Sequence, residues 1–323
     1  WQAALGVTVR VPHLSWVSME GEAKRDYPAS ISYQSPWFEE YSLIEDHFAR
    51  INTALTRGKP IVKVGVIHPV ESYWLHWGPV DQTADLREQL ESNFSNITEW
   101  LIFNHIDFDF ISESLLPNQC EKGGAPLKVG VMEYDTIIIP GCQTLRSTTA
   151  ERLKAFQKQG GHLIVMGEIP KYIDARPQKG ELDFLKSSIC IQFEKYALMN
   201  ELEQVREIDI RKDDGKRADH LITQFRQDGA NRWLFIANGH KPKTHDLVQP
   251  CNVKISIKGN WIPELYDTMA GEISTLNAEY NGNKTTIKYT LYTHDSLLLH
   301  LKPGVLAENN PVIKPALHIP SGE

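Results

Sequence analysis

The chain has 323 residues, of which 41% are hydrophobic and 23% are charged, a composition that excludes disordered, collagen-like and coiled-coil proteins. Its formal net charge of −7 argues against a nucleic-acid partner, which selects a basic face. Since no apolar run approaches the ~20 residues of a membrane span, we expect a soluble protein with no membrane partner.

Residues 1–58 predict one strand, a loop and one helix. Leu5–Val11 alternates apolar and polar side chains, which is the period of a strand. Ser35 is suited to cap a helix with Pro36 in its first turn, and Gly58 is suited to end it. Between them lies one apolar stripe, formed by Trp37, Tyr41, Ile44, Phe48, Ile51 and Leu55.

Residues 59–205 alternate strand and helix patterns, which predicts a parallel sheet covered by helices. The strand patterns lie at residues 61–67, 108–111, 135–139 and 163–166. One helix pattern begins near Asp81 or Thr83 and continues to Leu101. The other begins at a capping box formed by Thr148 and Glu151 and ends at Gly160–Gly161.

Residues 206–303 consist of short alternating or β-branched runs separated by turn residues such as Asp228–Gly229 and Asn281–Gly282. The runs lie at 221–225, 233–237, 253–257, 261–266, 285–291 and 296–301. They predict an antiparallel β-sandwich, followed by a loose Pro-rich tail at 304–323. The predicted fold class is therefore α/β, with a parallel doubly wound domain followed by a β-sandwich.

The cysteines and glycines give no cofactor or metal signal. Cys120, Cys142, Cys190 and Cys251 lie far apart without a C-x-x-C pair, so we predict neither a zinc site nor a disulfide scaffold. Gly123–Gly124 precedes a strand pattern, which is the wrong context for a phosphate-binding loop. We therefore predict no metal and no cofactor, and the compartment stays undetermined.

Two parts of the sequence resemble known families. Tyr134–Gly141, Leu145–Phe156 and Gly160–Gly167 resemble the glutamine-amidotransferase-like domain behind the barrel of large bacterial glycoside hydrolases, such as the trimerisation domain of family 42 β-galactosidases. His13–Pro28 with Gln34–Trp37 resembles the last strand and loop of the barrel in α-L-rhamnosidase-like hydrolases. Those enzymes continue, as this chain does, into an amidotransferase-like domain and a β-sandwich.

The resemblance implies that residues 1–58 are the last βα unit of a (β/α)8 barrel and 59–205 the amidotransferase-like domain, with 206–303 as the sandwich. A barrel needs eight such units, and the chain opens at Trp1 without an initiator Met, so we expect a C-terminal part of a longer bacterial hydrolase. Its catalytic carboxyls would then lie mostly upstream, leaving the chain non-catalytic alone. The implied partners are a carbohydrate, the remainder of the barrel and further copies in a homo-oligomer.

The loop after the first predicted strand holds the first group of candidate site residues. In barrels, loops after the strands carry the active site, which would place aromatic and charged side chains against a sugar. Glu20 is the one catalytic candidate that we consider. The substrate-binding candidates here are His13, Trp16, Lys24, Arg25 and Asp26. The alternative is a solvated loop with local ion pairs.

The loop at residues 68–77 holds the second group. It follows a predicted parallel strand, and loops at the carboxyl ends of such strands form binding crevices. Glu71, Trp74 and Trp77 are the residues of this loop that we expect to contact the ligand. The alternative is that Trp74 and Trp77 pack at a domain interface.

Two other functions remain open on sequence alone. A cysteine hydrolase of the amidotransferase-like class would use Cys142 as nucleophile with a histidine base such as His162. Gly141-Cys142-Gln143 lacks the second glycine of a nucleophile elbow, which favours a structural cysteine. The other possibility is a non-catalytic sugar-binding or oligomerisation module.

Overall fold

The computed structural model describes residues 1–22, 24, 31–241 and 249–306. The chain divides into two compact units, each described by itself below. Ile61–His220 forms the first, which we call the α/β unit, and Trp1–Pro60 with Leu221–Glu323 forms the second, which we call the β-rich unit.

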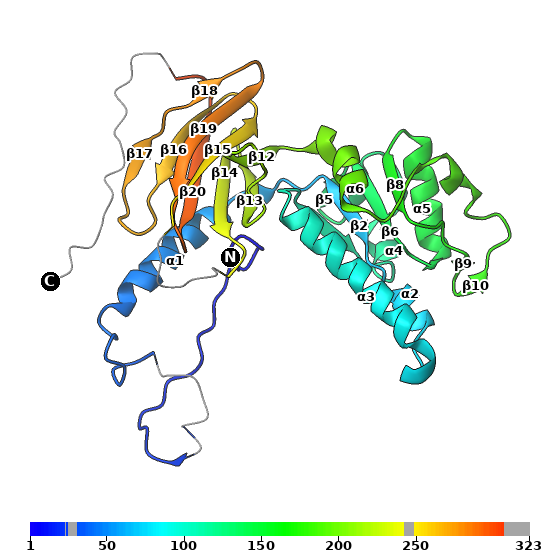
Figure 1. The fold of residues 1–323 in the computed structure, drawn as a ribbon, viewed down its shortest axis with the longest axis horizontal. Helices are drawn as coiled ribbons and strands as arrows, with labels where there is room; N and C mark the ends of the chain where they lie inside the picture. Colours follow the sequence, from blue (N-terminus) through cyan, green and yellow to red (C-terminus); the bar gives the residue numbers. More distant parts are fainter. Residues whose placement is uncertain (23, 25–30, 242–248, 307–323) are drawn as a thin grey trace. The chain divides into compact units, whose positions relative to one another are not determined.

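The α/β unit is built on a parallel sheet whose strands lie in the order β11-β8-β6-β2-β3. Figure 1 labels its inner strands β8, β6 and β2. Every neighbouring pair in this sheet is parallel. The strands are β2 (Val64–Ile67), β3 (Phe108–Ile111), β6 (Thr136–Pro140), β8 (His162–Met166) and β11 (Ile189–Ile191). All residues of β2 and β6 are buried, as expected for strands inside a sheet that is covered on both faces.

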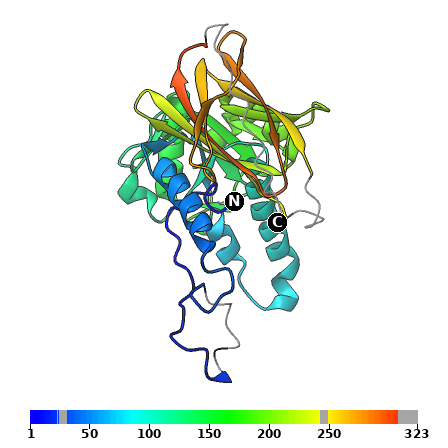
Figure 2. The same cartoon turned by 90° about the vertical axis from the view of Figure 1, so that its left-hand side faces the viewer.

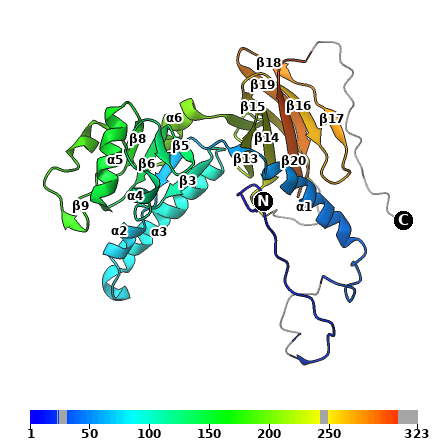
Figure 3. The same ribbon diagram turned by 180° about the vertical axis from the view of Figure 1, so that it is seen from behind.

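Helices pack on this sheet in two separate cores, because alternate residues of a strand point to opposite faces. Ile138 lies in the core that contains Ile97 of α3 and Leu198 of α6. Ile137 and Ile139 lie in the other core, with side chains of α4 and α5. The helices of this unit are α2 (Val70–Leu75), α3 (Val80–Ile102), α4 (Leu116–Gln119), α5 (Ser147–Lys158) and α6 (Lys195–Leu202), and Figure 3 shows them from the reverse side.

Short strands complete the α/β unit. β4 (Leu127–Val129) and β5 (Met132–Tyr134) form a hairpin. β7 (Thr144–Leu145) pairs in parallel with β9 (Tyr172–Ile173), which forms a second hairpin with β10 (Arg176–Pro177). β12 (Ile208–Lys212) follows two 3-10 turns, η2 (Asp183–Ser187) and η3 (Glu203–Val205), along the chain.

In the described residues, the β-rich unit contains antiparallel strands and the α-helix α1 (Tyr41–Leu55) (Figure 2). One sheet has the order β1-β13-β14-β20-β16-β17, and elsewhere β15 pairs with β19 and β19 with β18. The strands are β1 (Lys59–Pro60), β13 (Leu221–Asp228), β14 (Asn231–Asn238), β15 (Cys251–Lys258), β16 (Trp261–Tyr266), β17 (Ile273–Thr275), β18 (Glu279–Tyr280), β19 (Lys284–Leu291) and β20 (Ser296–Pro303). The C-terminal half of α1 is anchored by buried Ile51 and Leu55.

Most predicted elements are confirmed. The four strand patterns of residues 59–205 and the six runs after residue 206 all form strands, with ends shifted by a few residues. Mixed α/β architecture with one parallel sheet and antiparallel sheets is therefore established. β17 and β18 were missed because segments of three and two residues are too short to show a period of two.

The predicted strand at Leu5–Val11 is wrong for this structure. Residues 2–6 form turns, residues 7–11 have no regular structure, and Val9 and Val11 are 75% and 84% exposed. The alternating pattern is present, but a strand needs a neighbouring strand to take its backbone hydrogen bonds. The described residues supply none to this segment, so of the strand and helix predicted in residues 1–58 only the helix forms.

Three helix boundaries also differ from the prediction. α1 begins at Tyr41 instead of Ser35. Residues 36–40 form turns, and Trp37 and Phe38 stay 41% and 44% exposed, so they bury too little surface to stabilise a further helical turn. The predicted loop at residues 68–77 contains the helix α2. α5 begins at Ser147 with no side-chain cap from its own N-cap residue, so the Thr148–Glu151 capping box is wrong.

Among the described residues, no helix combines the length and apolar character that crossing a membrane requires.

Candidate ligand pocket

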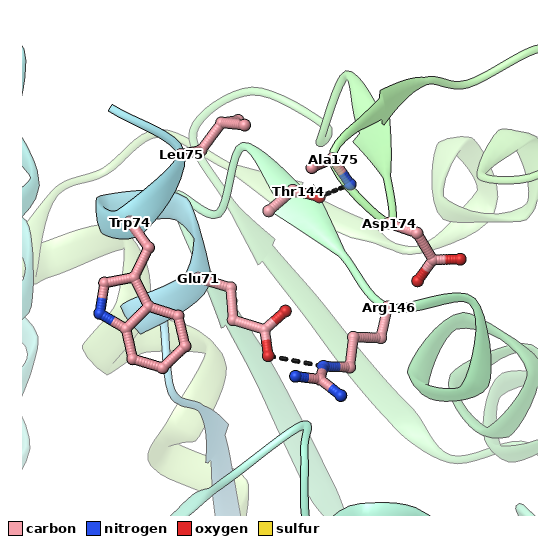
Figure 4. Close-up of a pocket in the computed structure, with 7 residues that line it drawn as sticks. All are labelled: Glu71, Trp74, Leu75, Thr144, Arg146, Asp174 and Ala175. Carbon is pink, nitrogen blue, oxygen red and sulfur yellow. Dashed lines mark hydrogen bonds and ion pairs between the residues drawn. The ribbon is translucent and has the colours of Figure 1, made fainter. Parts of the chain in front are cut away.

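An open pocket of about 450 Å³ lies within the α/β unit, between α2, β7 and the turn from β9 to β10 (Figure 4). Its volume is in the range of roughly 300–1,000 Å³ that small-molecule sites occupy. The residues that line it are Glu71, Trp74, Leu75, Thr144, Arg146, Asp174 and Ala175. Two of them, Glu71 and Trp74, were predicted as substrate-binding residues from the sequence.

The topology explains why these residues meet. α2 follows the carboxyl end of β2, and β7 follows the carboxyl end of its neighbour β6. Segments that leave adjacent parallel strands at the same edge converge above the sheet, which is where ligands bind in open α/β folds. Glu71 and Arg146 thereby come together although 75 positions separate them in the sequence.

An ion pair between Glu71 and Arg146 forms part of the polar lining of the pocket. Arg146 Nε donates to Glu71 Oε1 at 2.6 Å, and the Glu71 side chain is largely buried while that of Arg146 is 38% exposed. Figure 4 shows the Glu71 carboxylate between the indole of Trp74 and the guanidinium of Arg146. Trp74 itself is 61% exposed, so one broad aromatic surface faces solvent beside this pair.

A buried carboxyl, that of Glu113, binds the backbone of the pocket residue Arg146. Glu113 is buried, and its Oε2 accepts a hydrogen bond from the Arg146 backbone N–H at 2.8 Å. Burial raises the pKa of Glu113 to about 7, and the negative charge of Glu71 adds to this, while the Arg146 N–H opposes it. Glu113 therefore changes its protonation state close to neutral pH without lining the pocket itself.

The turn that carries Asp174 is locally strained and firmly held. Asp174 and Ala175 have φ values of +48° and +60°, a left-handed pair that a two-residue hairpin requires but that glycine or asparagine usually supplies. Asp174 Oδ1 accepts the Ser147 N–H at 3.0 Å, and Thr144 Oγ1 accepts the Ala175 N–H at 3.2 Å. Asp174 thus caps α5 from outside the helix, in place of the predicted capping box.

The arrangement around Cys142 does not favour a cysteine hydrolase. Cys142 is buried, and burial raises the pKa of its thiol, with the nearby carboxyls of Glu113 and Glu71 adding to the shift. Ser72 Oγ accepts the N–H groups of Gln143 and Thr144 at 2.8 and 3.3 Å. The amide after the cysteine, which would stabilise an oxyanion in a nucleophile elbow, is therefore already occupied.

His162 also cannot act as the base for Cys142. It pairs in register with Thr136 at the start of β6, whereas Cys142 lies beyond the end of that strand. The six residues that follow Thr136, up to Cys142, span about 20 Å of extended chain, so the His162 ring lies too far from the Cys142 thiol to take its proton. His162 instead lies within hydrogen-bonding distance of Thr136 and Gln204.

The first group of predicted site residues belongs to the β-rich unit, and none of its described members lines this pocket. His13 and Glu20 are exposed, and the rings of His13 and Trp16 lie 5.6 Å apart. Lys24 Nζ donates to the Ser18 carbonyl at 2.7 Å. Arg25 and Asp26 lie outside the described residues.

Trp77 lies close to the pocket in the sequence but does not line it. Its side chain is 69% exposed, and the Arg87 guanidinium lies 4.9 Å from the centre of its ring. Trp74 and Trp77 are both exposed, and their packing at a domain interface stays a prediction. Thr144, Arg146 and Asp174 were not predicted from the sequence. Loops at the carboxyl ends of neighbouring parallel strands meet, and this rule would have pointed to the segment after β6.

Comparison with solved structures shows what the fold is similar to. A rhamnosidase from Novosphingobium sp. PP1Y matches 89% of the chain with a TM-score of 0.63 at 13% identity. A GH42 β-galactosidase from G. stearothermophilus matches 83% of the chain with a TM-score of 0.52 at 11% identity. A β-galactosidase from Bacillus circulans sp. alkalophilus matches 84% of the chain with a TM-score of 0.50 at 11% identity. The chain spans 27%, 44% and 46% of these three proteins, respectively.

The fold is therefore one found in glycoside hydrolases, and the resemblance read from the sequence is confirmed at the level of fold. No family model and no curated protein sequence matches the chain at a significant level.

Proposed function

We propose that the chain is a C-terminal region of a glycoside hydrolase of the α-L-rhamnosidase-like group, with most of the catalytic barrel supplied by residues outside it. In this proposal the α/β unit is the doubly wound, amidotransferase-like domain, and the strands from β13 onward form the β-sandwich. The region lines one side of a sugar pocket through the loop at His13–Asp26 and gives scaffold and oligomer contacts. The fold similarity to the rhamnosidase supports this assignment.

The observation that carries the proposal is the exposed apolar surface of the first 44 residues. A soluble monomer rarely exposes a large apolar patch, so such a surface marks a site that another part of the protein covers. The exposed large apolar residues here are Trp1, Leu5, Val7, Val9, Val11, Leu14, Val17, Met19, Tyr33, Trp37, Phe38, Leu43 and Ile44.

Two patterns within this surface indicate what covers it. The alternation of Leu5, Val7, Val9 and Val11 is that of a strand, yet the described residues provide no neighbouring strand. The apolar stripe of α1 continues from buried Ile51 and Leu55 to exposed Ile44, beyond the part of the helix that the β-rich unit buries. A segment with a strand pattern followed by a helix, both left uncovered, is what the last βα unit of a barrel would become without its neighbours.

The test compares the chain with the longer protein translated from the same reading frame. We expect the longer protein to hydrolyse aryl α-rhamnosides or β-galactosides and to protect the amides of Leu5–Val11 from hydrogen exchange. The chain alone should do neither, while the amides of Val64–Ile67 are protected in both and serve as the internal control.

Either of two results would contradict the proposal. One is sustained turnover by the chain alone that Glu20→Gln abolishes, since a complete site would then lie here. The other is a reading frame without an upstream barrel.

A further inference from the structure

The pocket of the α/β unit has the features of a binding site in its own right. Among the described residues, all that line it lie in the range from Glu71 to Ala175 of the α/β unit. We propose that this pocket binds a neutral saccharide unit, with Trp74 stacking on the sugar ring while Arg146, Glu71 and Asp174 bind its hydroxyl groups.

The charges in the pocket select a neutral ligand. The guanidinium of Arg146 is already compensated by Glu71 at 2.6 Å, and Asp174 adds a second carboxylate. The lining therefore carries two acidic groups against one basic group. A uronate, a sulfated sugar or a phosphate would meet net repulsion here, whereas a hydroxyl group would not.

The same groups match the hydrogen-bonding capacity of a sugar. Only Nε of Arg146 binds Glu71, and the terminal nitrogens of the guanidinium fork are further donors beside the second oxygen of Glu71. Adjacent donors and acceptors suit neighbouring hydroxyl groups, each of which both donates and accepts. Asp174 offers one more acceptor, because only its Oδ1 is taken by Ser147.

Trp74 supplies the apolar part of the recognition. A pyranose presents C–H groups on its faces and hydroxyl groups around its rim, so a flat aromatic ring beside a polar rim is complementary to it. The Trp74 side chain is 61% exposed, and in Figure 4 its ring stands next to Glu71 at the edge of the pocket. Indole combines a large apolar face with low conformational freedom, which makes its exposure favourable for binding.

The polar side of the pocket is held in place before any ligand arrives. The strained turn at Asp174–Ala175 persists because Thr144 and Ser147 bind it, and strain of this kind concentrates at functional sites. The ion pair fixes the Arg146 side chain in the same way. A preformed arrangement lowers the ordering cost of binding a small ligand.

Binding is measured by ligand-observed NMR titration of the chain with methyl glycosides of rhamnose, galactose, fucose, glucose and mannose, at low salt. Galacturonic acid methyl glycoside is the matched anionic probe for the galactoside. We expect at least one neutral glycoside to bind, with the uronate weaker than its neutral partner by fivefold or more.

Variants locate the site. Trp74→Ala should weaken binding at least tenfold, and Arg146→Lys, which keeps the charge without the planar fork, should weaken it about fivefold. Trp77→Ala is the matched control, since it removes a similarly exposed indole that lies three residues after Trp74 and does not line the pocket, and it should change binding less than twofold.

Three outcomes would overturn the inference: no binding of any neutral glycoside, equal losses in Trp74→Ala and Trp77→Ala, or tighter binding of the uronate. None of them bears on the turnover of the longer protein, so a failure here is distinguishable from a failure of the proposed function. Retention of the circular dichroism spectrum by each variant shows that folding is intact.

Discussion

Two segments of this chain carry similar strand patterns and reach different structures. Ile61–Ile67 contains β2, whose residues are all buried between β3 and β6. Leu5–Val11 has the cleaner alternation, yet it forms no strand, and its valines are exposed. The difference teaches that periodicity states how a segment can be buried, whereas partner strands decide whether it is buried.

The largest expected effect is a difference in stability between two valine-to-alanine variants, one in each segment. Val66→Ala should lower the free energy of unfolding by about 2–3 kcal/mol, because Val66 is fully buried and its lost methyl groups leave a cavity. Val9→Ala should stay within about 0.5 kcal/mol, because Val9 is 75% exposed. Urea unfolding of both variants measures the contrast, and equal losses would mean that Val9 is buried in solution.

The next effect concerns pH. The raised pKa of Glu113, about 7 against a usual 4.5, means that its stabilising contribution is full below about pH 4.5 and is lost as the pH rises through 7. Glu113→Gln should therefore reduce the loss of unfolding free energy between pH 5 and pH 8 by about 2 kcal/mol.

Glu20→Gln is the matched control for this pH dependence, because Glu20 is an exposed carboxyl of the N-terminal segment. It should leave the difference between pH 5 and pH 8 unchanged. Unfolding in urea at the two pH values measures both variants. An unchanged pH dependence in Glu113→Gln would show that Glu113 is ionised throughout this range.

The smallest expected effect concerns the backbone strain at Ala175 in the α/β unit. Ala175 has φ +60°, so Ala175→Gly should raise the free energy of unfolding of the α/β unit by up to about 1 kcal/mol. The gain shows as a higher urea midpoint with an unchanged slope. A loss of stability would instead mean that the methyl group of Ala175 contributes packing that outweighs the strain.

The sequence predicted the regular parts of both units well. Continuous apolar runs such as Ile137–Ile139 and alternating runs such as Val253–Ile257 could be read directly, because their periods reflect burial on two faces or on one. The helix α1 was predicted to begin too early, and the cause is the same as for the wrong strand at Leu5–Val11. Both depend on contacts that the described residues do not supply.

The pocket was only half predictable. Glu71 and Trp74 lie in a short segment rich in aromatic and ionisable residues, and that local density pointed to them. Arg146 follows a two-residue strand, and Asp174 lies in a turn without the usual glycine, so neither has a local signature. They reach Glu71 only through the pairing of β6 with β2 and of β7 with β9.

The four cysteines offer a practical route to the arrangement of the molecule in solution. No disulfide joins them, and Cys120 and Cys142 are buried with thiol pKa values raised by that burial, which slows their reaction with alkylating reagents. Cys190 is exposed on β11, and Cys251 is partly exposed at the start of β15. One solvent-accessible thiol therefore lies in each unit. Spin labels or a donor–acceptor dye pair on the native chain would report the separation of the two units without any engineered attachment point.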